Sequence, residues 1–105
     1  MKTAVCVISK NEDQYLLEWV EYYKHIGFDN IIFYDNNNYN DFNQYNIIKS
    51  YIDSGFIKYH DYKNMHNCSQ QHFAYVDCLS NYKNTFDWIA FFDIDEFLVL
   101  KEHNT

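Results

Sequence analysis

The chain has 105 residues, of which 48% are hydrophobic and 21% aromatic, and its net charge at pH 7 is −7. This length predicts one domain, residues 1–105, with enough aromatic side chains to bury a sizeable core. Its 8 strongly basic residues are all Lys and are outnumbered by 15 acidic ones, which excludes the basic surface that nucleic-acid binding requires. An acidic chain that handles a phosphorylated small molecule needs a metal ion as mediator.

The cysteines and the N-terminus predict a cytoplasmic protein without a membrane span. Cys68 and Cys78 stand ten residues apart in one predicted helix, roughly 15 Å along its axis and too far for a disulfide. Cys6 belongs to an apolar strand, so we expect buried thiols in a reducing cytosol. The apolar stretch Thr3–Ser9 is broken at Lys10 and is too short for a signal peptide or a membrane span.

The first predicted elements are a strand and an amphipathic helix. Thr3–Ser9 is nearly continuously apolar, which is typical of a strand buried on both faces of a parallel sheet. The following segment has apolar residues at helical spacing, and Gly27 ends it. The residues expected to face inward are Leu16, Trp19, Val20, Tyr23 and Ile26.

Three further strands alternate with two further helices. The predicted strands are Asn30–Tyr34, Phe56–Tyr59 and Trp88–Phe92. The second helix contains Phe42, Tyr45, Ile48 and Ile52 and stops at Gly55, while the third follows Ser69 as N-cap and turns Phe73, Val76 and Leu79 inward. Trp19 and Trp88 both fit core positions. The loop Asn36–Asp41 is rich in Asn, which favours Asx turns.

This alternation predicts an α/β fold with a parallel sheet and helices on both faces, as in Rossmann-like nucleotide-binding domains. We expect Thr3–Ser9 to be central, between Asn30–Tyr34 and Trp88–Phe92. Four polar clusters then fall at the carboxyl ends of strands, where open α/β sheets bind ligands. They are Lys10–Glu12, Asp35–Asn37, His60–Ser69 and Asp93–Glu96.

Asp93 and Asp95 form the sharpest motif. Alternate residues of an extended segment face the same side, so both carboxylates can point into one cleft. Two hard oxygen donors, with phosphate oxygens and water, suit Mg²⁺ or Mn²⁺. The alternative is a solvated acidic turn, but the apolar strand directly before the motif favours a metal site.

The other polar residues each have a structural alternative. Asp35 could accept hydrogen bonds from a ribose or a base, or could cap a turn. Ser9 and Glu12 could contact a ligand, or could form a capping box on the first helix. Lys10 is typical of a surface position. His60, His66 and His72 recur at intervals of six, which places no two on one helix face and argues against zinc.

Several short motifs together resemble the family-2-like glycosyltransferases of GT-A fold. The first is Ser9-Lys10-Asn11-Glu12, followed by Tyr15-Leu16-x-Glu18-Trp19 and Tyr34-Asp35-Asn36. Later come Gln71-His72-x-x-Tyr75 and Trp88-x-x-Phe91-x-Asp93-x-Asp95-Glu96-Phe97. The match extends over nearly the whole chain, in order and with sensible spacing.

The resemblance implies a nucleotide-diphospho-sugar donor, a divalent metal and a glycan or other hydroxyl acceptor. By position, Ser9, Lys10, Asn11, Glu12 and Asp35 would face the nucleoside. Asp93 would lie near the ribose or the metal and Asp95 would be the main metal ligand, while Gln71 or His72 would approach the nucleotide. The family's strand order would place the first and fourth strands side by side and bring Glu12 close to Asp95.

The resemblance thus predicts a metal-dependent, inverting sugar transfer, with this chain as the N-terminal donor-binding part of a longer domain. Such a displacement needs a carboxylate base, which we expect beyond Thr105. Two alternatives remain: a nucleotide- and metal-binding module without activity, and a haloacid-dehalogenase-like phosphotransferase, whose Asp-x-Asp also follows a buried strand. The apolar run Phe97–Leu100 further predicts a homodimer through this segment.

Overall fold

The computed structural model of the chain describes residues 2–10, 13–37, 41–63 and 70–92, and these form a four-stranded parallel sheet with helices on both faces. Strands and helices alternate along the chain, as predicted. In order, they are β1 (Thr3–Ser9), α1 (Asp13–His25), β2 (Asn30–Asp35), α2 (Asn43–Asp53), β3 (Ile57–Asp61), α3 (Gln70–Tyr82) and β4 (Trp88–Phe91). The predicted α/β fold class is therefore confirmed.

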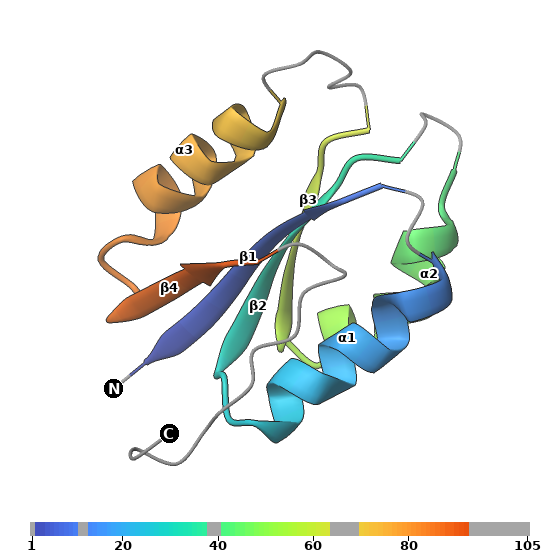
Figure 1. Cartoon of the computed structure of the whole chain (residues 1–105), viewed down its shortest axis with the longest axis horizontal. Coiled ribbons are helices and arrows are strands. Elements are labelled where there is room, and N and C mark those ends of the chain that lie inside the picture. Colours follow the sequence, from blue (N-terminus) through green and yellow to red (C-terminus); the bar gives the residue numbers. More distant parts are fainter. Residues whose placement is uncertain (1, 11–12, 38–40, 64–69, 93–105) are drawn as a thin grey trace, which may run out of the picture.

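The strand order is β3-β2-β1-β4, and all neighbouring strands are parallel. In register, Val5 of β1 lies between Ile31 of β2 and Ala90 of β4. The central position of β1 and its pairing with both β2 and β4 are thus confirmed. Figure 1 shows α1 and α2 on one face of the sheet and α3 on the other.

The two faces of β1 supply two separate hydrophobic clusters. Val5 and Val7 point toward α1 and α2, whereas Ala4 and Cys6 belong to the cluster beneath α3. This division follows from the alternation of side chains along a strand. Because both faces are covered, β1 needs apolar residues at nearly every position, which explains its unbroken apolar sequence.

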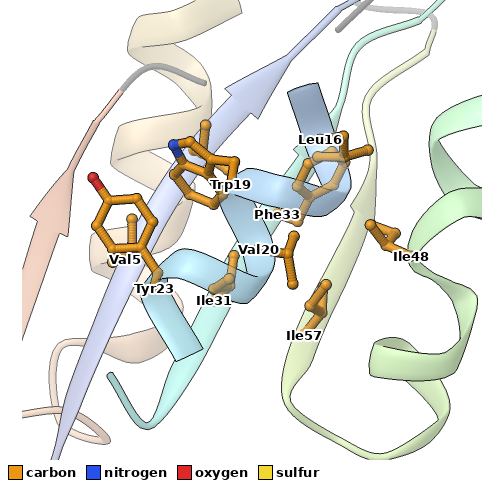
Figure 2. Close-up of a cluster of buried hydrophobic side chains, with 10 residues drawn as sticks. Val5, Leu16, Trp19, Val20, Tyr23, Ile31, Phe33, Ile48 and Ile57 are labelled. Carbon is orange, nitrogen blue, oxygen red and sulfur yellow. The ribbon is translucent and has the colours of Figure 1, made fainter. Parts of the chain in front are cut away.

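Helix α1 packs on the sheet through the face that its spacing predicts. Leu16, Trp19, Val20 and Tyr23 are all completely buried, and Figure 2 shows them above Val5, Ile31 and Phe33 of the sheet, with Ile48 and Ile57 beside them. Fully burying one such side chain contributes about 1.5–3 kcal/mol. The chain leaves the helix through Gly27, whose φ of 108° is a conformation that favours glycine.

The predicted inward face of α3 is wrong. Phe73, Val76 and Leu79 are 47%, 46% and 46% exposed, and the helix instead buries Ala74 and Cys78. The sheet face beneath it is occupied by large rings, including the fully buried Tyr34. The fully buried contacts of the helix with those rings are made by small side chains, while Tyr75 and Tyr82 pack partly buried against the same cluster.

Two aromatic residues assigned to packed elements are also exposed. Trp88 is 67% exposed at the start of β4, so its predicted core position is wrong. Phe42 precedes the first residue of α2 and is 53% exposed.

Strand β3 runs two residues further than predicted, to Asp61, and includes His60, which the sequence had placed in a loop.

Within the described part of the chain, no helix combines the length and the apolar composition needed to cross a bilayer. Cys6 and Cys78 are buried free thiols, as expected, and lie in the same cluster. Contact with Cys78 and burial raise the pKa of the Cys6 thiol. Cys68, Ser69 and the dimer segment Phe97–Leu100 fall outside the described residues.

Candidate functional site

The carboxyl ends of β1 and β2 meet at one edge of the sheet. Ser9 and Asp35, the last residues of these strands, are partners in the parallel register. The backbone N–H of Asn36 donates to the carbonyl oxygen of Ser9 at 2.9 Å, and that of Tyr62 donates to the carbonyl oxygen of Asp35 at 2.8 Å. The chain segments that leave β1, β2 and β3 therefore begin side by side.

Gln44, on the first turn of α2, joins the ends of β1 and β2 through its side chain. Its amide nitrogen Nε2 donates to the carbonyl oxygen of Ser9 at 3.0 Å and to Oδ1 of Asp35 at 2.9 Å. Its amide oxygen Oε1 accepts a 2.5 Å hydrogen bond from the hydroxyl of Ser9. Gln44 and Asp35 are completely buried and Ser9 nearly so, so these bonds form away from water and hold the edge rigid.

The second carboxylate oxygen of Asp35 is bound from β3 and the segment after it. Tyr59 donates its hydroxyl to Oδ2 of Asp35 at 2.6 Å, and the Nζ of Lys63 lies 3.6 Å from the same oxygen. Burial, followed by this hydrogen bond to Asp35, raises the pKa of Tyr59. Lys63 is only 4% exposed, so a buried cation balances the buried carboxylate.

Asp35 also organises the turn that follows β2. Its Oδ1 accepts a hydrogen bond from the backbone N–H of Asn37 at 3.1 Å, and Asp41 makes the same contact with the N–H of Asn43 at 2.9 Å. These are the Asx turns expected of the Asn-rich loop. Asp35 thus has the turn-capping role that the sequence offered as one alternative, and its role toward a nucleoside stays a prediction.

Only some of the remaining predicted site residues lie in the described part of the chain. Lys10 is exposed directly after β1, at the same sheet edge as Ser9. Gln71 and His72 lie in the first turn of α3, with side chains outside the described part. The other predicted residues, also outside it, are Asn11, Glu12, Asp93 and Asp95.

The capping box that the sequence offered as one alternative for Ser9 and Glu12 involves Glu12, which lies outside the described residues. Helix α1 is described from Asp13 onward. The Ser9 hydroxyl donates to Gln44. Ser9 therefore belongs to the polar network at the sheet edge.

The last described residue of the chain lies at the same end of the sheet as this network. Strand β4 pairs with β1 up to Phe91 opposite Cys6, and the N–H of Phe92 donates to the carbonyl oxygen of Cys6. Asp93 is the next residue in the sequence. Among the described residues, no group of three or more His, Cys, Asp or Glu side chains could hold a metal ion; the predicted ligands Asp93 and Asp95 lie outside them.

Sequence reasoning missed Gln44, Tyr59 and Lys63. A signal for Gln44 was present, because it precedes Ile48 by four residues and so stands on the buried stripe of α2. A polar residue on such a stripe indicates a buried hydrogen-bonding partner. Tyr59 and Lys63 carry no comparable signal, since their bonds to Asp35 join residues far apart in the sequence.

A second polar cluster lies on the α3 face of the sheet. His60 stacks on Tyr34 with ring centroids 4.7 Å apart, and its Nε2 is 2.7 Å from the hydroxyl of Tyr82. Tyr34 donates its hydroxyl to Oδ2 of Asp77 at 2.8 Å. Burial lowers the pKa of His60, and the nearby Asp77 carboxylate opposes this effect. These contacts fix α3 to the sheet.

Comparison with known proteins identifies related sequences. Residues 2–105 match the sequence model of Glycosyltransferase family 92. A glycosyltransferase family 92 protein of Ricinus communis is 31% identical over 97 residues, which cover 91% of this chain and 17% of the relative. Another, of Oryza sativa subsp. japonica, is 29% identical over 94 residues, covering 90% of this chain and 15% of the relative.

These matches confirm the expected relationship to glycosyltransferases and refine it. The matching family is number 92, whereas the motifs resembled family-2-like enzymes of GT-A fold. That finer assignment and its Asp-x-Asp motif are not confirmed and stay predictions. The family match gives no support to a haloacid-dehalogenase-like phosphotransferase. The chain spans only 15–17% of the length of these relatives.

Proposed function

Because the chain belongs to glycosyltransferase family 92, we propose that it provides the nucleotide-sugar-binding part of a glycosyltransferase. The reaction is transfer of a sugar from a nucleoside-diphosphate donor to an acceptor hydroxyl, with the nucleoside diphosphate as leaving group. The donor binds at the sheet edge where Ser9 and Asp35 lie side by side. This convergence of the strand ends is the observation that supports the location, because α/β sheets bind nucleotides there.

The rigid network beneath this edge supports the assignment. Every polar atom of the Asp35 carboxylate has a partner on β3, on α2 or in the following turn, and those bonds orient the backbone of both strand ends. A binding site gains affinity when its groups are held in place before the ligand arrives. Ser9 and Asp35 therefore fix the platform, and Lys10, exposed directly after β1, is placed to reach the nucleoside.

A divalent cation, Mg²⁺ or Mn²⁺, is part of this proposal. Asp93 and Asp95 supply carboxylate oxygens, which are ligands that both ions accept, and Asp93 follows the end of β4 beside β1. When bound, the ion offsets the charge of the donor diphosphate, which a chain of net charge −7 would otherwise repel. Inversion at the anomeric carbon completes the proposed reaction, and the carboxylate that accepts the proton is not assigned to this chain.

Chemical-shift mapping tests the location of the donor. The ¹⁵N-labelled chain is titrated separately with UDP, GDP and ADP. Each titration contains either a trace of Mn²⁺ or an excess of Mg²⁺. We expect one of these nucleotides to shift the amides of Ser9, Lys10 and Asn36. The amides of Lys2, Asp29 and Asp87, at the opposite ends of the strands, serve as the internal control. Shifts confined to that opposite edge, or none with any nucleotide, would contradict the proposal.

A further inference from the structure

A small pocket lies beside the Ser9–Asp35 edge, between the start of α2 and the end of β3. Its volume is about 200 Å³, and its lining residues are Phe42, Tyr45, Tyr59, Asp61 and Lys63. Strand β3 is at one end of the strand order, so this pocket sits at the margin of the sheet. Its size suits a single ring and is smaller than the sites that hold whole drug-sized ligands.

Three aromatic rings form the walls of the pocket. Tyr45 meets Tyr59 edge to face with ring centroids 5.1 Å apart, and Tyr59 is stacked on Phe33 at 6.2 Å. The hydrogen bond from Tyr59 to Asp35 fixes the orientation of its ring. Ligands that enter the pocket therefore meet preformed aromatic surfaces, whose negative faces attract the weakly positive C–H groups of a saturated ring.

Phe42 stands at a position where helix capping disfavours an apolar residue. It occupies the N-cap position of α2, where residues with a side-chain acceptor are preferred, and it makes no capping hydrogen bond. Its ring is also 53% exposed, so its position is not explained by burial in the core. Because Phe42 also lines the pocket, its exposed ring is accessible to a ligand that enters there.

The charges of the pocket select against ions. The Nζ of Lys63 donates to the Tyr59 hydroxyl at 2.9 Å, lies 3.3 Å from Oδ1 of Asp61, and is 4.8 Å from the centroid of the Phe42 ring. The chain's own ammonium already lies over one face of the Phe42 ring, so a ligand cation at this ring would be repelled by it. Two carboxylates, those of Asp35 and Asp61, surround this one cation, so an anionic phosphate gains nothing there.

Asp61 offers the polar contact that a neutral ligand needs. Its Oδ1 accepts a hydrogen bond from the backbone N–H of Lys63 at 2.9 Å. Its Oδ2 has no hydrogen-bond partner within the described part of the chain, and its side chain is 61% exposed. This oxygen is thus an available acceptor for hydroxyl groups at the mouth of an aromatic pocket.

We propose that this pocket binds one neutral sugar ring, with its C–H face on Phe42 and Tyr45 and a hydroxyl donating to Asp61. The ring belongs to the acceptor glycan, an assignment that rests on the proposed function. The pocket is separate from the donor edge, because Tyr59 and Lys63 stand between the pocket and Asp35.

The test uses the ¹⁵N-labelled chain and the methyl β-glycosides of D-galactose, D-glucose and D-xylose. We expect at least one of them to shift the amides of Tyr45, Tyr59 and Asp61. Phe42→Ala should weaken that binding about three- to tenfold, because one stacking surface is lost, and Asp61→Asn should weaken it as well. Phe73→Ala, which truncates a similarly exposed ring on α3, is the matched control and should bind as the wild type does.

The other outcomes separate this proposal from the donor site. Binding of none of the glycosides, or binding that survives Phe42→Ala unchanged, would overturn it. Shifts of the same residues by uridine or tetramethylammonium in place of the glycosides would also overturn it, in favour of a base or a cation site. Glycoside binding in this pocket without nucleotide binding at Ser9 would support the sugar-binding pocket and contradict the proposed function.

Discussion

The amide nitrogen of Gln44 donates to Oδ1 of Asp35 at 2.9 Å, and both side chains are completely shielded from water. The same nitrogen donates to the carbonyl oxygen of Ser9, so one side chain of α2 ties together the ends of β1 and β2. Because hydrogen bonds of this kind cannot be replaced by water without opening the core, the sheet edge depends on this residue.

Replacement of Gln44 should therefore destabilise the fold. Gln44→Ala leaves the Ser9 hydroxyl and one oxygen of Asp35 short of a buried partner, and we expect the free energy of unfolding to fall by about 2–4 kcal/mol. Urea denaturation measures this change. Asn46→Ala, at an exposed position of the same helix, is the control and should be neutral or slightly stabilising. Equal midpoints for the two variants would refute a structural role for Gln44.

The buried ion pair of Lys63 and Asp35 gives a second prediction. Lys63→Met keeps the aliphatic stem but leaves the Asp35 carboxylate without its cation, which should cost about 3–5 kcal/mol of stability. Lys49→Met breaks an ion pair with Asp53 whose side chains are 54% and 62% exposed, and should change little, because water screens such pairs. Thermal and urea unfolding of both variants compare the two pairs. A loss for Lys63→Met no larger than for Lys49→Met would be inconsistent with the network.

The contrast between these residues shows what the sequence could predict. The apolar run of β1 and the helical spacing from Leu16 to Tyr23 report burial directly, so the central strand and the packing of α1 were predicted correctly. The bonds of Asp35 to Tyr59 and Lys63 depend on which strands become neighbours. Local sequence patterns do not encode such pairings, and the network was therefore missed.

Helix α3 and Trp88 show a different limit. Apolar residues at i, i+3 and i+6 ordinarily mark a buried face, yet Phe73, Val76 and Leu79 are exposed. The α3 side chains that pack on the cluster around Tyr34 are Ala74 and Cys78, with Tyr75 and Tyr82 partly buried against it, and this choice of face depends on the shape of the sheet surface. Of the candidate site, the sequence correctly located the strand ends but not the side chains that hold them.

The two tryptophans provide a direct check of burial. Trp19 is completely buried and Trp88 is 67% exposed. We expect Trp19→Ala to cost about 3–5 kcal/mol of stability, whereas Trp88→Ser should change it by less than about 0.5 kcal/mol. Fluorescence quenching by acrylamide on single-tryptophan variants gives an independent measure. A strongly protected Trp88 would show that the start of β4 is covered.

The lowered pKa of His60 predicts how stability varies with pH. Because burial lowers this pKa from its usual value of 6.5, the unfolded chain binds the proton more readily than the folded chain does. The free energy of unfolding should therefore fall as the pH drops below about 6.5. In His60→Gln this fall should be smaller between about pH 7 and pH 5.5. An NMR titration of the His60 ring with a midpoint at or above the usual value would contradict this prediction.

Calorimetric titration of a nucleoside diphosphate, with and without Mn²⁺, tests the proposed donor site most directly. The nucleotide is the one that shifts the Ser9 amide, and the proteins are the wild type, Asp95→Asn and Asp93→Asn. We predict tight binding only with Mn²⁺, because phosphate oxygens and the two carboxylates share the ion. Asp95→Asn should abolish this dependence, and Asp93→Asn should reduce it. Nucleotide affinity that is the same with and without metal in the wild type would contradict the account.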